Sequence, residues 1–162
     1  MANRVFNESQ TYRGTWLIYF ILMLELPTLI LLTVLFFTSE EKQEMGLALV
    51  FVIGIMSLAM TLIFNIKLET RIDNHGIYYR YLPFIRKWRW IRKESICSLE
   101  VINFNPILEY GGWGMKGNKT TKLYNITGDA GLLIDSGESK KTLLGTLKAQ
   151  DLKIFLEDWI EE

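Results

Sequence analysis

The strongest pattern along the chain is a pair of long runs in which almost every residue is apolar. The first run covers residues 16–37 and holds a single charge, and the second covers residues 45–66 and holds none. A helix needs about 20 apolar residues to cross the hydrocarbon core of a bilayer, so each run of 22 residues is long enough. A chain of 162 residues could not cover two helices that are apolar on every side. The pattern therefore predicts a transmembrane hairpin, with residues 1–66 as N-terminal tail and hairpin.

The charges around the two runs predict an orientation. The connector, residues 38–44, is acidic with one lysine, whereas the segments outside the hairpin are basic. The basic residues outside the hairpin are Arg4, Arg13, Lys67, Arg71, Arg80, Arg86, Lys87, Arg89, Arg92 and Lys93. Cytoplasmic flanks of membrane spans carry an excess of Lys and Arg. We therefore expect a multi-pass protein of the cell (inner) membrane with both termini in the cytoplasm.

Two residues inside the first run are unusual for a membrane span. Glu25 lies nine residues after Trp16, near the bilayer centre, where an ionised carboxylate is costly. Pro27 removes a backbone donor and predicts a kink. Either the pair handles protons or ions in a pore, or a protonated Glu25 makes a hydrogen bond at a helix interface. In the second run, Gly46 and Gly54 lie near one face and favour close helix contact.

From residue 67 onward the pattern changes to short alternating runs separated by turn residues. Seven strands are expected, at residues 67–73, 77–82, 86–91, 97–104, 122–127, 131–136 and 139–146. Residues 148–162 form a helical pattern whose apolar stripe consists of Leu152, Phe155, Leu156, Trp159 and Ile160. The prediction for residues 67–162 is a partly open, seven-stranded antiparallel barrel capped by a C-terminal helix. With the hairpin, the fold class is an α+β membrane protein.

Two stretches in this half carry a resemblance to a known group. The hairpin "RIDNHGIYYRY" (residues 71–81) and the later "ESICSLEVINF" (residues 94–104), followed by a closing strand and helix, resemble the bacterial pleckstrin-homology-like (PH-like) domains. The resemblance covers residues 67–162. It implies a PH-like fold placed behind two transmembrane helices in an uncharacterised family. It implies no particular ligand.

Composition narrows the chemistry. The chain has one cysteine, Cys97, and one histidine, His75, so neither an internal disulfide nor a cysteine metal cluster is available. We expect Cys97 to be a small buried residue at a strand start, and His75 to be exposed in a turn. We predict no catalytic, cofactor-binding or metal-binding residues. The net charge of zero and the local nature of the basic segments argue against nucleic-acid binding.

The segment "RKWRWIRK", residues 86–93, combines basic and aromatic residues. Alternation places Trp88 and Trp90 on one face of a strand and Lys87 with Arg89 on the other. We predict that the tryptophans lie in the core. The basic side chains are either contacts for lipid headgroups or a solvated strand surface. The candidate headgroup contacts are Arg86, Lys87, Arg89, Arg92 and Lys93.

The segment "EYGGWGMKGNK", residues 109–119, raises the question of a phosphate loop. Such a loop requires a lysine after its last glycine and a helix after that lysine. Here Asn118 follows Gly117, and strands are expected on both sides. A glycine-rich bend or bulge between strands is the preferred interpretation, and contact with the membrane or another subunit is the second. The residues of this bend are Tyr110, Gly111, Gly112, Trp113 and Gly114.

These patterns lead to three functional hypotheses. The first is a membrane-anchored PH-like interaction or scaffold protein without catalysis, which self-associates and binds a protein partner of unknown identity. The second is an oligomeric channel or transport component that uses Glu25 and Pro27 in the membrane. The third, and weakest, is a membrane enzyme, because no catalytic set is present in the sequence.

Overall fold

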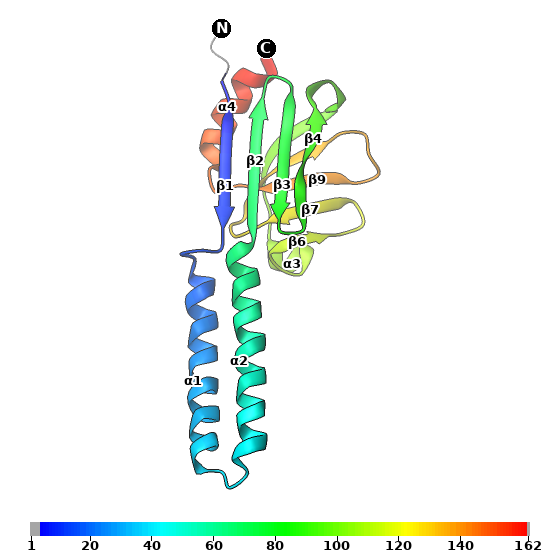
Figure 1. Cartoon of the computed structure of the whole chain (residues 1–162). Helices are drawn as coiled ribbons and strands as arrows, with labels where there is room; N and C mark the ends of the chain where they lie inside the picture. Colours follow the sequence, from blue (N-terminus) through cyan, green and yellow to red (C-terminus); the bar gives the residue numbers. More distant parts are fainter. Residues whose placement is uncertain (1–3, 162) are drawn as a thin grey trace. The chain divides into compact units, whose positions relative to one another are not determined.

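The computed structural model describes residues 4–161, so residues 1–3 and 162 of the predicted ranges 1–66 and 67–162 lie outside the described part. The chain forms two compact units. A helical unit comprises Tyr12–Ile66, and a β unit comprises the chain up to Thr11 together with the chain from Lys67 onward. The helical unit is thus an insertion between two parts of the β unit (Figure 1).

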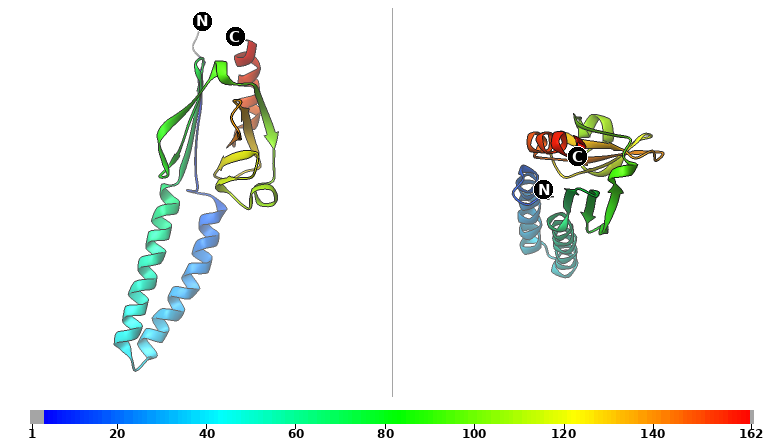
Figure 2. Two further views of the ribbon diagram at one scale, coloured as in Figure 1. Left: turned by 90° about the vertical axis from the view of Figure 1, so that its right-hand side faces the viewer. Right: turned by 90° about the horizontal axis from the view of Figure 1, so that it is seen from above.

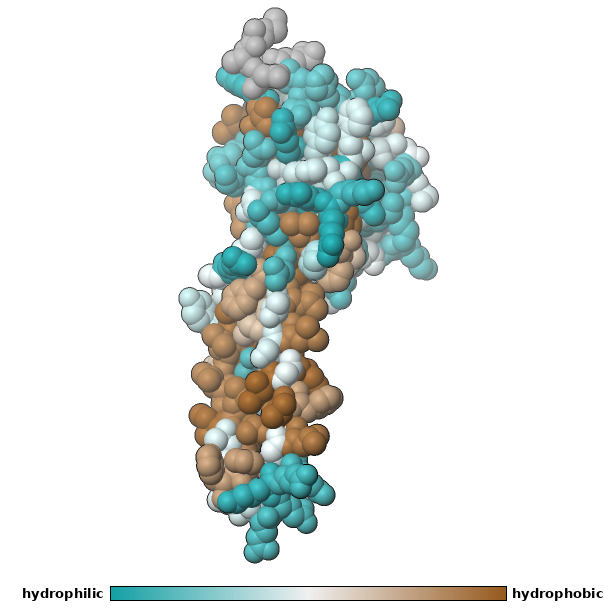
Figure 3. Space-filling model, in the orientation of Figure 1, coloured by the Kyte–Doolittle hydropathy of each residue, from teal (hydrophilic) through white to brown (hydrophobic). Residues whose placement is uncertain are grey.

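The helical unit consists of two helices close to the predicted bounds. They are α1 (Trp16–Thr38) and α2 (Lys42–Asn65), with mean hydropathies of 2.4 and 2.7. Their most apolar windows have no buried residue, and apolar colours cover both helices in the space-filling view (Figure 3). Both helices are therefore long enough and apolar enough to cross a membrane.

The two helices share a seam. The half-buried residues recur every three or four positions, as in a coiled coil: Ile21, Glu25, Leu29, Leu32 and Phe36 on α1, and Leu49, Val52, Met56, Met60 and Ile63 on α2. A Cβ atom on Gly46 would lie 3.1 Å from the Phe36 ring, whereas one on Gly54 would meet nothing within 4 Å. Gly46 therefore lies at a close contact between α1 and α2, whereas Gly54 does not.

The first sheet of the β unit, sheet A, has four antiparallel strands in the order β1-β2-β3-β4. They are β1 (Phe6–Thr11), β2 (Lys67–Asp73), β3 (Gly76–Leu82) and β4 (Ile85–Arg92). Strand β1 was not predicted from the sequence, which assigned this segment to a tail. It pairs with β2 along its whole length, from Phe6 opposite Ile72 to Thr11 opposite Lys67.

The second sheet, sheet B, has five strands in the order β5-β8-β9-β7-β6. They are β5 (Ser98–Asn103), β6 (Gly114–Gly117), β7 (Thr121–Asn125), β8 (Ala130–Asp135) and β9 (Lys141–Gly145). A short helix, α3 (Pro106–Tyr110), lies between β5 and β6, and a 3-10 turn, η1 (Lys93–Ser95), joins the two sheets. Figure 2 shows the two sheets facing each other.

The predicted seven-stranded antiparallel barrel is wrong in three respects. Residues 4–161 form nine strands, and these make two separate sheets that do not close into a barrel. In addition, β7 and β9 pair in parallel, with Leu123 opposite Leu143. The parallel pair arises because β9 lies between β8 and β7 in the sheet, although both of those strands precede it in sequence.

The core of the β unit lies between the sheets and under the C-terminal helix, α4 (Ala149–Glu161). Leu152, Leu156 and Trp159 of the predicted stripe are buried, Phe155 is half-buried against Phe6, and Ile160 is exposed, contrary to expectation. The Trp159 indole N–H donates to the Asp73 carbonyl oxygen over 2.8 Å, so the buried ring has its polar group satisfied.

A polar cluster ties β1 to the loop between β9 and α4. The buried carboxylate of Glu8 accepts from the Thr146 hydroxyl at 2.6 Å and from the Leu147 backbone N–H at 2.7 Å. The Gln10 side-chain amide donates to the Gly145 carbonyl oxygen at 2.7 Å. The inward residues of β1 are therefore mostly polar, which is why its sequence does not show the alternation of a half-buried strand.

Candidate functional site

Strand β4 is the most unusual surface element of the β unit. It forms an edge of sheet A, and none of its eight residues is fully buried. The pairing of Ile77 with Ile91 and of Tyr78 with Trp90 assigns Arg89 and Ile91 to the inner face of the sheet and Trp90 and Arg92 to the outer face. The outer face of this strand is therefore available for contacts.

The outer face of β3 and β4 carries a cluster of aromatic and arginine side chains. The rings of Tyr78 and Trp90 stack with centroids 5.6 Å apart and planes 4° from parallel. The Arg92 guanidinium lies 5.1 Å from the centroid of the Trp90 ring, and the Arg80 guanidinium lies 4.6 Å from that of Trp88. Both are within the range of cation–π attraction. We call Tyr78, Arg80, Trp88, Trp90 and Arg92 the outer-face cluster.

The prediction that Trp88 and Trp90 lie in the core is wrong, although the prediction that they share a face is confirmed. They are 45% and 49% exposed. The inner face of sheet A uses Ile77, Tyr79 and Tyr81 instead. The alternation identified the correct face, but it could not show which face a second sheet would cover.

Glu69 orders Arg80, the arginine that lies against the Trp88 ring. Its carboxylate forms ion pairs with Arg80 and, at 2.5 Å, with Lys67. Burial raises the pKa of Glu69, but the hydrogen bonds from Arg80 and Lys67 outweigh it, so the net pKa lies below its ordinary value. The cluster is thus ordered by charge pairs and ring stacking rather than by burial.

Two of the predicted headgroup contacts have partners inside the β unit. Arg89 points inward and donates to the Tyr124 hydroxyl of sheet B at 3.1 Å. A hydrogen bond to Tyr79 raises the pKa of Arg89 further above its ordinary value, against the effect of burial. Lys93 donates to the Trp159 carbonyl oxygen at 2.5 Å, and its ammonium lies 4.5 Å from the centroid of that ring. These two cations therefore connect β4 and η1 to the rest of the β unit.

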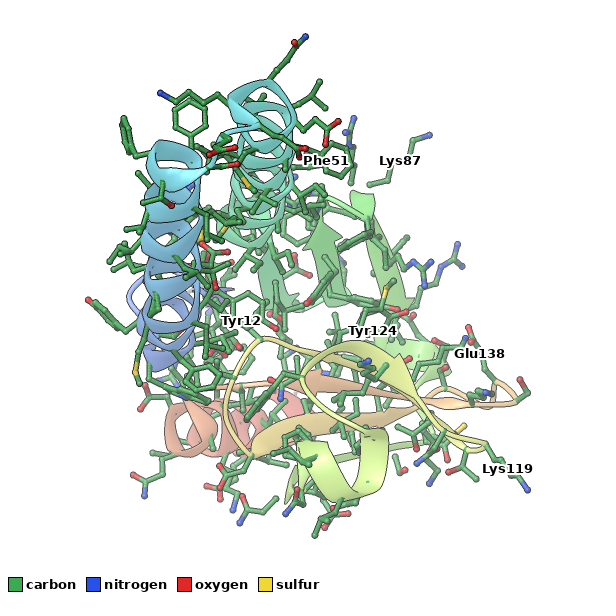
Figure 4. The ribbon with its side chains drawn as sticks, turned by 90° about the horizontal axis from the view of Figure 1, so that it is seen from below. Tyr12, Phe51, Lys87, Lys119, Tyr124 and Glu138 are labelled. Atoms are coloured by element: carbon green, nitrogen blue, oxygen red, sulfur yellow. The ribbon has the colours of Figure 1, made fainter. Side chains whose placement is uncertain are left out.

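Arg86 and Lys87 are exposed, at the turn that joins β3 to β4. An open hollow of about 430 Å³ is lined there by residues 83–89, and Phe84 at its rim is 58% exposed. Figure 4 shows Lys87 pointing away from the sheets, while Tyr124 lies between them. A second open hollow, of about 570 Å³, lies beyond the opposite end of β4 and is lined by His75, Trp90, Arg92, Glu94 and Ser95. His75 is exposed, as predicted.

The glycine-rich segment forms a helix end rather than a bulge. The Asn105 side chain caps α3 by accepting from the backbone N–H groups of Ile107 and Leu108, each at 3.1 Å. Gly111 ends the helix with a φ of +73°, a left-handed conformation that glycine favours. The expectation of strands on both sides is therefore wrong, because a helix precedes the glycines.

The side chains of this segment lie at different depths. Tyr110 packs edge-to-face on Phe104, with centroids 5.8 Å apart, in a small core on the far side of sheet B. Burial raises the pKa of Tyr110. Trp113 is half-buried and lines an open hollow of about 450 Å³ beside α3, and Gly112 and Gly114 on either side of it have φ of +127° and +100°. Tyr110 is therefore packed inside the β unit and does not form an exposed loop contact.

Glu25 and Pro27 both lie within one continuous helix, α1. Glu25 is half-buried on the seam with α2 and has no hydrogen-bond or ion-pair partner within residues 4–161. Since Phe36 meets Gly46 across the antiparallel pair, Glu25 lies at the level of Ser57, a residue with a hydroxyl group. Glu25 therefore lies in the half-buried row that α1 turns toward α2.

The described residues offer no evident site for a metal ion. No group of three or more His, Cys, Asp or Glu side chains in residues 4–161 is arranged to hold one. Cys97 is exposed rather than buried, which corrects the prediction. It precedes β5 at the end of sheet B, where its backbone N–H donates to the Asp135 carbonyl oxygen at 2.7 Å, and no layer covers the side chain.

Comparison with known proteins adds no relative. No protein-family model matches the chain, and no curated protein or solved structure matches it.

Proposed function

We propose that this protein is a membrane-anchored interaction module. In this proposal α1 and α2 cross the membrane as a hairpin, the β unit lies on the cytoplasmic side, and the outer-face cluster binds a protein partner without catalysis. Helices α1 and α2 support the membrane anchor because no residue in the most apolar segment of either helix is buried. The basic segments outside the hairpin and the acidic connector support the orientation.

The observation that carries the proposal is the exposure of Trp88 and Trp90 among arginines on the outer face of sheet A. Tryptophan, tyrosine and arginine are the residues that most often dominate binding energy at protein interfaces. Arg92 has no carboxylate partner within residues 4–161, and Arg80 shares one with Lys67. The cluster therefore favours a partner segment that brings carboxylates and apolar side chains together.

The PH-like assignment belongs to this proposal. A four-stranded meander, a second sheet facing it and a C-terminal helix against the core are compatible with a PH-like domain. Two features depart from the expected pattern, namely the strand β1 ahead of the helices and the parallel pairing of β7 with β9. The anchored β domain does not depend on the PH-like assignment.

Self-association is part of the same proposal. The apolar surfaces of α1 and α2 outside their seam are large, and helices in a bilayer associate through such surfaces by close packing. The channel hypothesis would require Glu25 to face a path between copies. Its half-buried position on the seam supports instead a place between the two helices of one chain.

Site-specific photocrosslinking in native membranes tests the proposal. A photoreactive residue at Trp90 should give one discrete adduct, whereas one at Asn7, which is exposed on the same sheet face outside the cluster, should give none. The mass of the adduct separates a second copy of this chain from a different protein. Absence of any adduct at Trp90 would remove the recognition surface. Release of the protein by alkaline carbonate would remove the membrane anchor.

A further inference from the structure

The pairing register identifies the end of the β unit from which the chain continues into both helices. Thr11, Lys67 and Leu82 form one row across β1, β2 and β3. Only four residues separate Thr11 from the start of α1, and only Ile66 separates α2 from Lys67. Two Cα–Cα steps span at most about 8 Å, so this end of sheet A stays close to the end of an apolar helix.

Exposed apolar side chains gather at this same end. Phe84, in the turn after Leu82, is 58% exposed. Helix α3 contributes Ile107 and Leu108, which are 56% and 83% exposed. More than half of each side chain therefore lies outside the packing of the β unit, although one side of the Phe84 ring stacks on Tyr81 with centroids 6.3 Å apart.

Hydrogen bonds of the β unit place α3 near this row. The Tyr81 hydroxyl donates to the Asn125 carbonyl oxygen at 3.3 Å, and the Asn125 side-chain amide donates to the Gly128 carbonyl oxygen at 3.2 Å. Phe104, just before α3, donates its backbone N–H to the Asp129 carbonyl oxygen at 2.7 Å. Figures 1 and 2 show α3 at the end of the β unit toward which β3 runs.

The length of the helices sets the depth of this end. Helix α2 has 24 residues, or about 36 Å at about 1.5 Å per residue, against a hydrocarbon core of about 30 Å. Its ends therefore reach the headgroup layer, where aromatic and apolar side chains bind at the boundary with the acyl chains.

The charges differ between the two parts of this end. Arg86 and Lys87 follow Phe84, and they would favour anionic headgroups. Beside Ile107 and Leu108 lie Glu109 and Asp129, which would not. Arg92 and Lys93 lie elsewhere: Arg92 pairs with Gly76 at the opposite end of the sheet, and the six-residue step from Lys67 to Asp73 corresponds to about 20 Å.

We infer that the end of the β unit formed by the β3–β4 turn and α3 inserts Phe84, Ile107 and Leu108 into the phospholipid interface, with Arg86 and Lys87 on headgroup phosphates. The inference rests on the proposed membrane anchor. It assigns to the bilayer two of the five basic residues first considered for that role, and it excludes Arg92 and Lys93. The β unit is then held against the membrane at this end, and the outer-face cluster keeps a fixed height above it.

Nitroxide labels on the full chain in lipid nanodiscs test this inference. Cys97→Ser removes the exposed native cysteine, and single cysteines are introduced as Phe84→Cys, Leu108→Cys and Asn74→Cys. Asn74 is the matched control, since it is exposed in the β2–β3 turn at the opposite end of sheet A. Labels at 84 and 108 should be more accessible to oxygen than to a water-soluble nickel chelate, and the label at 74 should show the reverse.

A charge comparison sharpens the test. When phosphatidylglycerol is added to phosphatidylcholine, lipid contact should increase at 84 and stay unchanged at 108. Arg86→Gln or Lys87→Gln should each lower the equilibrium constant for lipid contact at 84 by about fivefold in the anionic bilayer. Aqueous accessibility at both 84 and 108 would overturn the inference. A label at Leu58 in α2 distinguishes failure of this inference from failure of the membrane anchor. Aqueous accessibility at Leu58 would overturn the anchor itself.

Discussion

Helix α4 carries one tryptophan and strand β4 carries two on a single face, yet the two faces have opposite environments. Trp159 on α4 is buried, donates to the Asp73 carbonyl oxygen and lies under the Lys93 ammonium. Trp88 and Trp90 on β4 are nearly half exposed and have only neighbouring side chains of the same sheet beside them. Sequence periodicity is equally clear in both elements.

The difference between them is the presence of a second layer. The apolar face of α4 packs on sheet A, and β1 contributes Phe6 to that contact. Among the described residues of the β unit, no second layer packs on the outer face of sheet A, where Trp88 and Trp90 are 45% and 49% exposed. An exposed tryptophan is unfavourable in water, but stacking with Tyr78 and contact with an arginine remove part of its apolar surface from water. This arrangement supports the proposal that the outer face binds a partner.

Replacing Trp159 should have the largest effect on the free energy of unfolding. Trp159→Ala leaves a cavity and removes the partner of the Asp73 carbonyl oxygen, so we expect a loss of about 3–5 kcal/mol. Trp90→Ala, made for comparison, should cost about 1 kcal/mol or less. Denaturant unfolding of the full chain in mild detergent, followed by near-UV circular dichroism, measures both. Equal losses would show that Trp90 is packed like a core residue, contrary to its exposure.

Glu8 should rank second. Glu8→Ala removes the acceptor of the buried Thr146 hydroxyl and of the part-buried Leu147 backbone N–H, so both donors lose their partner, at a cost of about 2–3 kcal/mol. Ser9→Ala, at the exposed neighbouring position, is the control and should change stability by less than about 0.5 kcal/mol. Hydrogen exchange of the β9–α4 loop gives a local readout, and unchanged protection in Glu8→Ala would show that β1 does not hold the loop.

Most of the regular structure is predictable from local pattern. The two apolar runs give α1 and α2, alternation gives β2, β3 and β4, and the 3.6-residue stripe gives α4. In each of these elements, the pattern of apolar and polar residues lies within the segment itself and identifies its type.

The missed elements have identifiable reasons. Strand β1 was hidden because its inward residues Glu8 and Gln10 bind a loop instead of packing in an apolar core. Helix α3 is absent from the prediction because the strand expected at residues 97–104 is followed directly by Asn105-Pro106, a pair that also marks the end of a strand. Asn at the N-cap followed by Pro at the first helical position is nevertheless a helix-start signal. The parallel pairing of β7 with β9 joins distant segments, so no local pattern contains it.

The sequence identified the residues of the candidate site on β4, but it did not show which of their side chains are exposed. The basic and aromatic residues of β4 were identified from the sequence, and the placement of Trp88 and Trp90 on the face opposite Arg89 is confirmed. Which face a second layer covers is a property of the tertiary structure. The inward partners of Arg89 and Lys93 come from residues 35 and 66 positions away, so the sequence could not separate these cations from Arg86 and Lys87.

A change at Trp88 should affect the outer face without unfolding the protein. Trp88→Ser removes the ring beneath the Arg80 guanidinium, and we expect a loss of stability of about 0.5–1 kcal/mol, together with loss of the crosslink formed at Trp90. Thr11→Ser, on the same face near the helix attachments, should leave the crosslink intact. A crosslink that survives Trp88→Ser would confine recognition to Trp90 and Tyr78.

The smallest expected effect concerns the pH dependence set by Glu69, and it tests whether the outer face is ordered by charge. Burial raises the pKa of Glu69, but hydrogen bonds from Arg80 and Lys67 lower it by more, so the folded-state pKa lies below that of the unfolded chain. The contribution of Glu69 is therefore complete above about pH 4.5 and is lost as the pH falls through the folded-state pKa.

Glu69→Gln should remove that part of the acid dependence. The difference in unfolding free energy between wild type and variant should be about 1 kcal/mol or less at pH 7 and should shrink toward pH 3. Glu94→Gln, at an exposed carboxylate without an ion pair in residues 4–161, should follow the wild-type curve. A Glu69→Gln difference that stays constant from pH 7 to pH 3 would mean that the side chain acts through shape and not through charge. The position of Arg80 would then depend on its cation–π contact with Trp88 alone. In that case the proposed binding of a partner would not depend on a guanidinium ordered by Glu69.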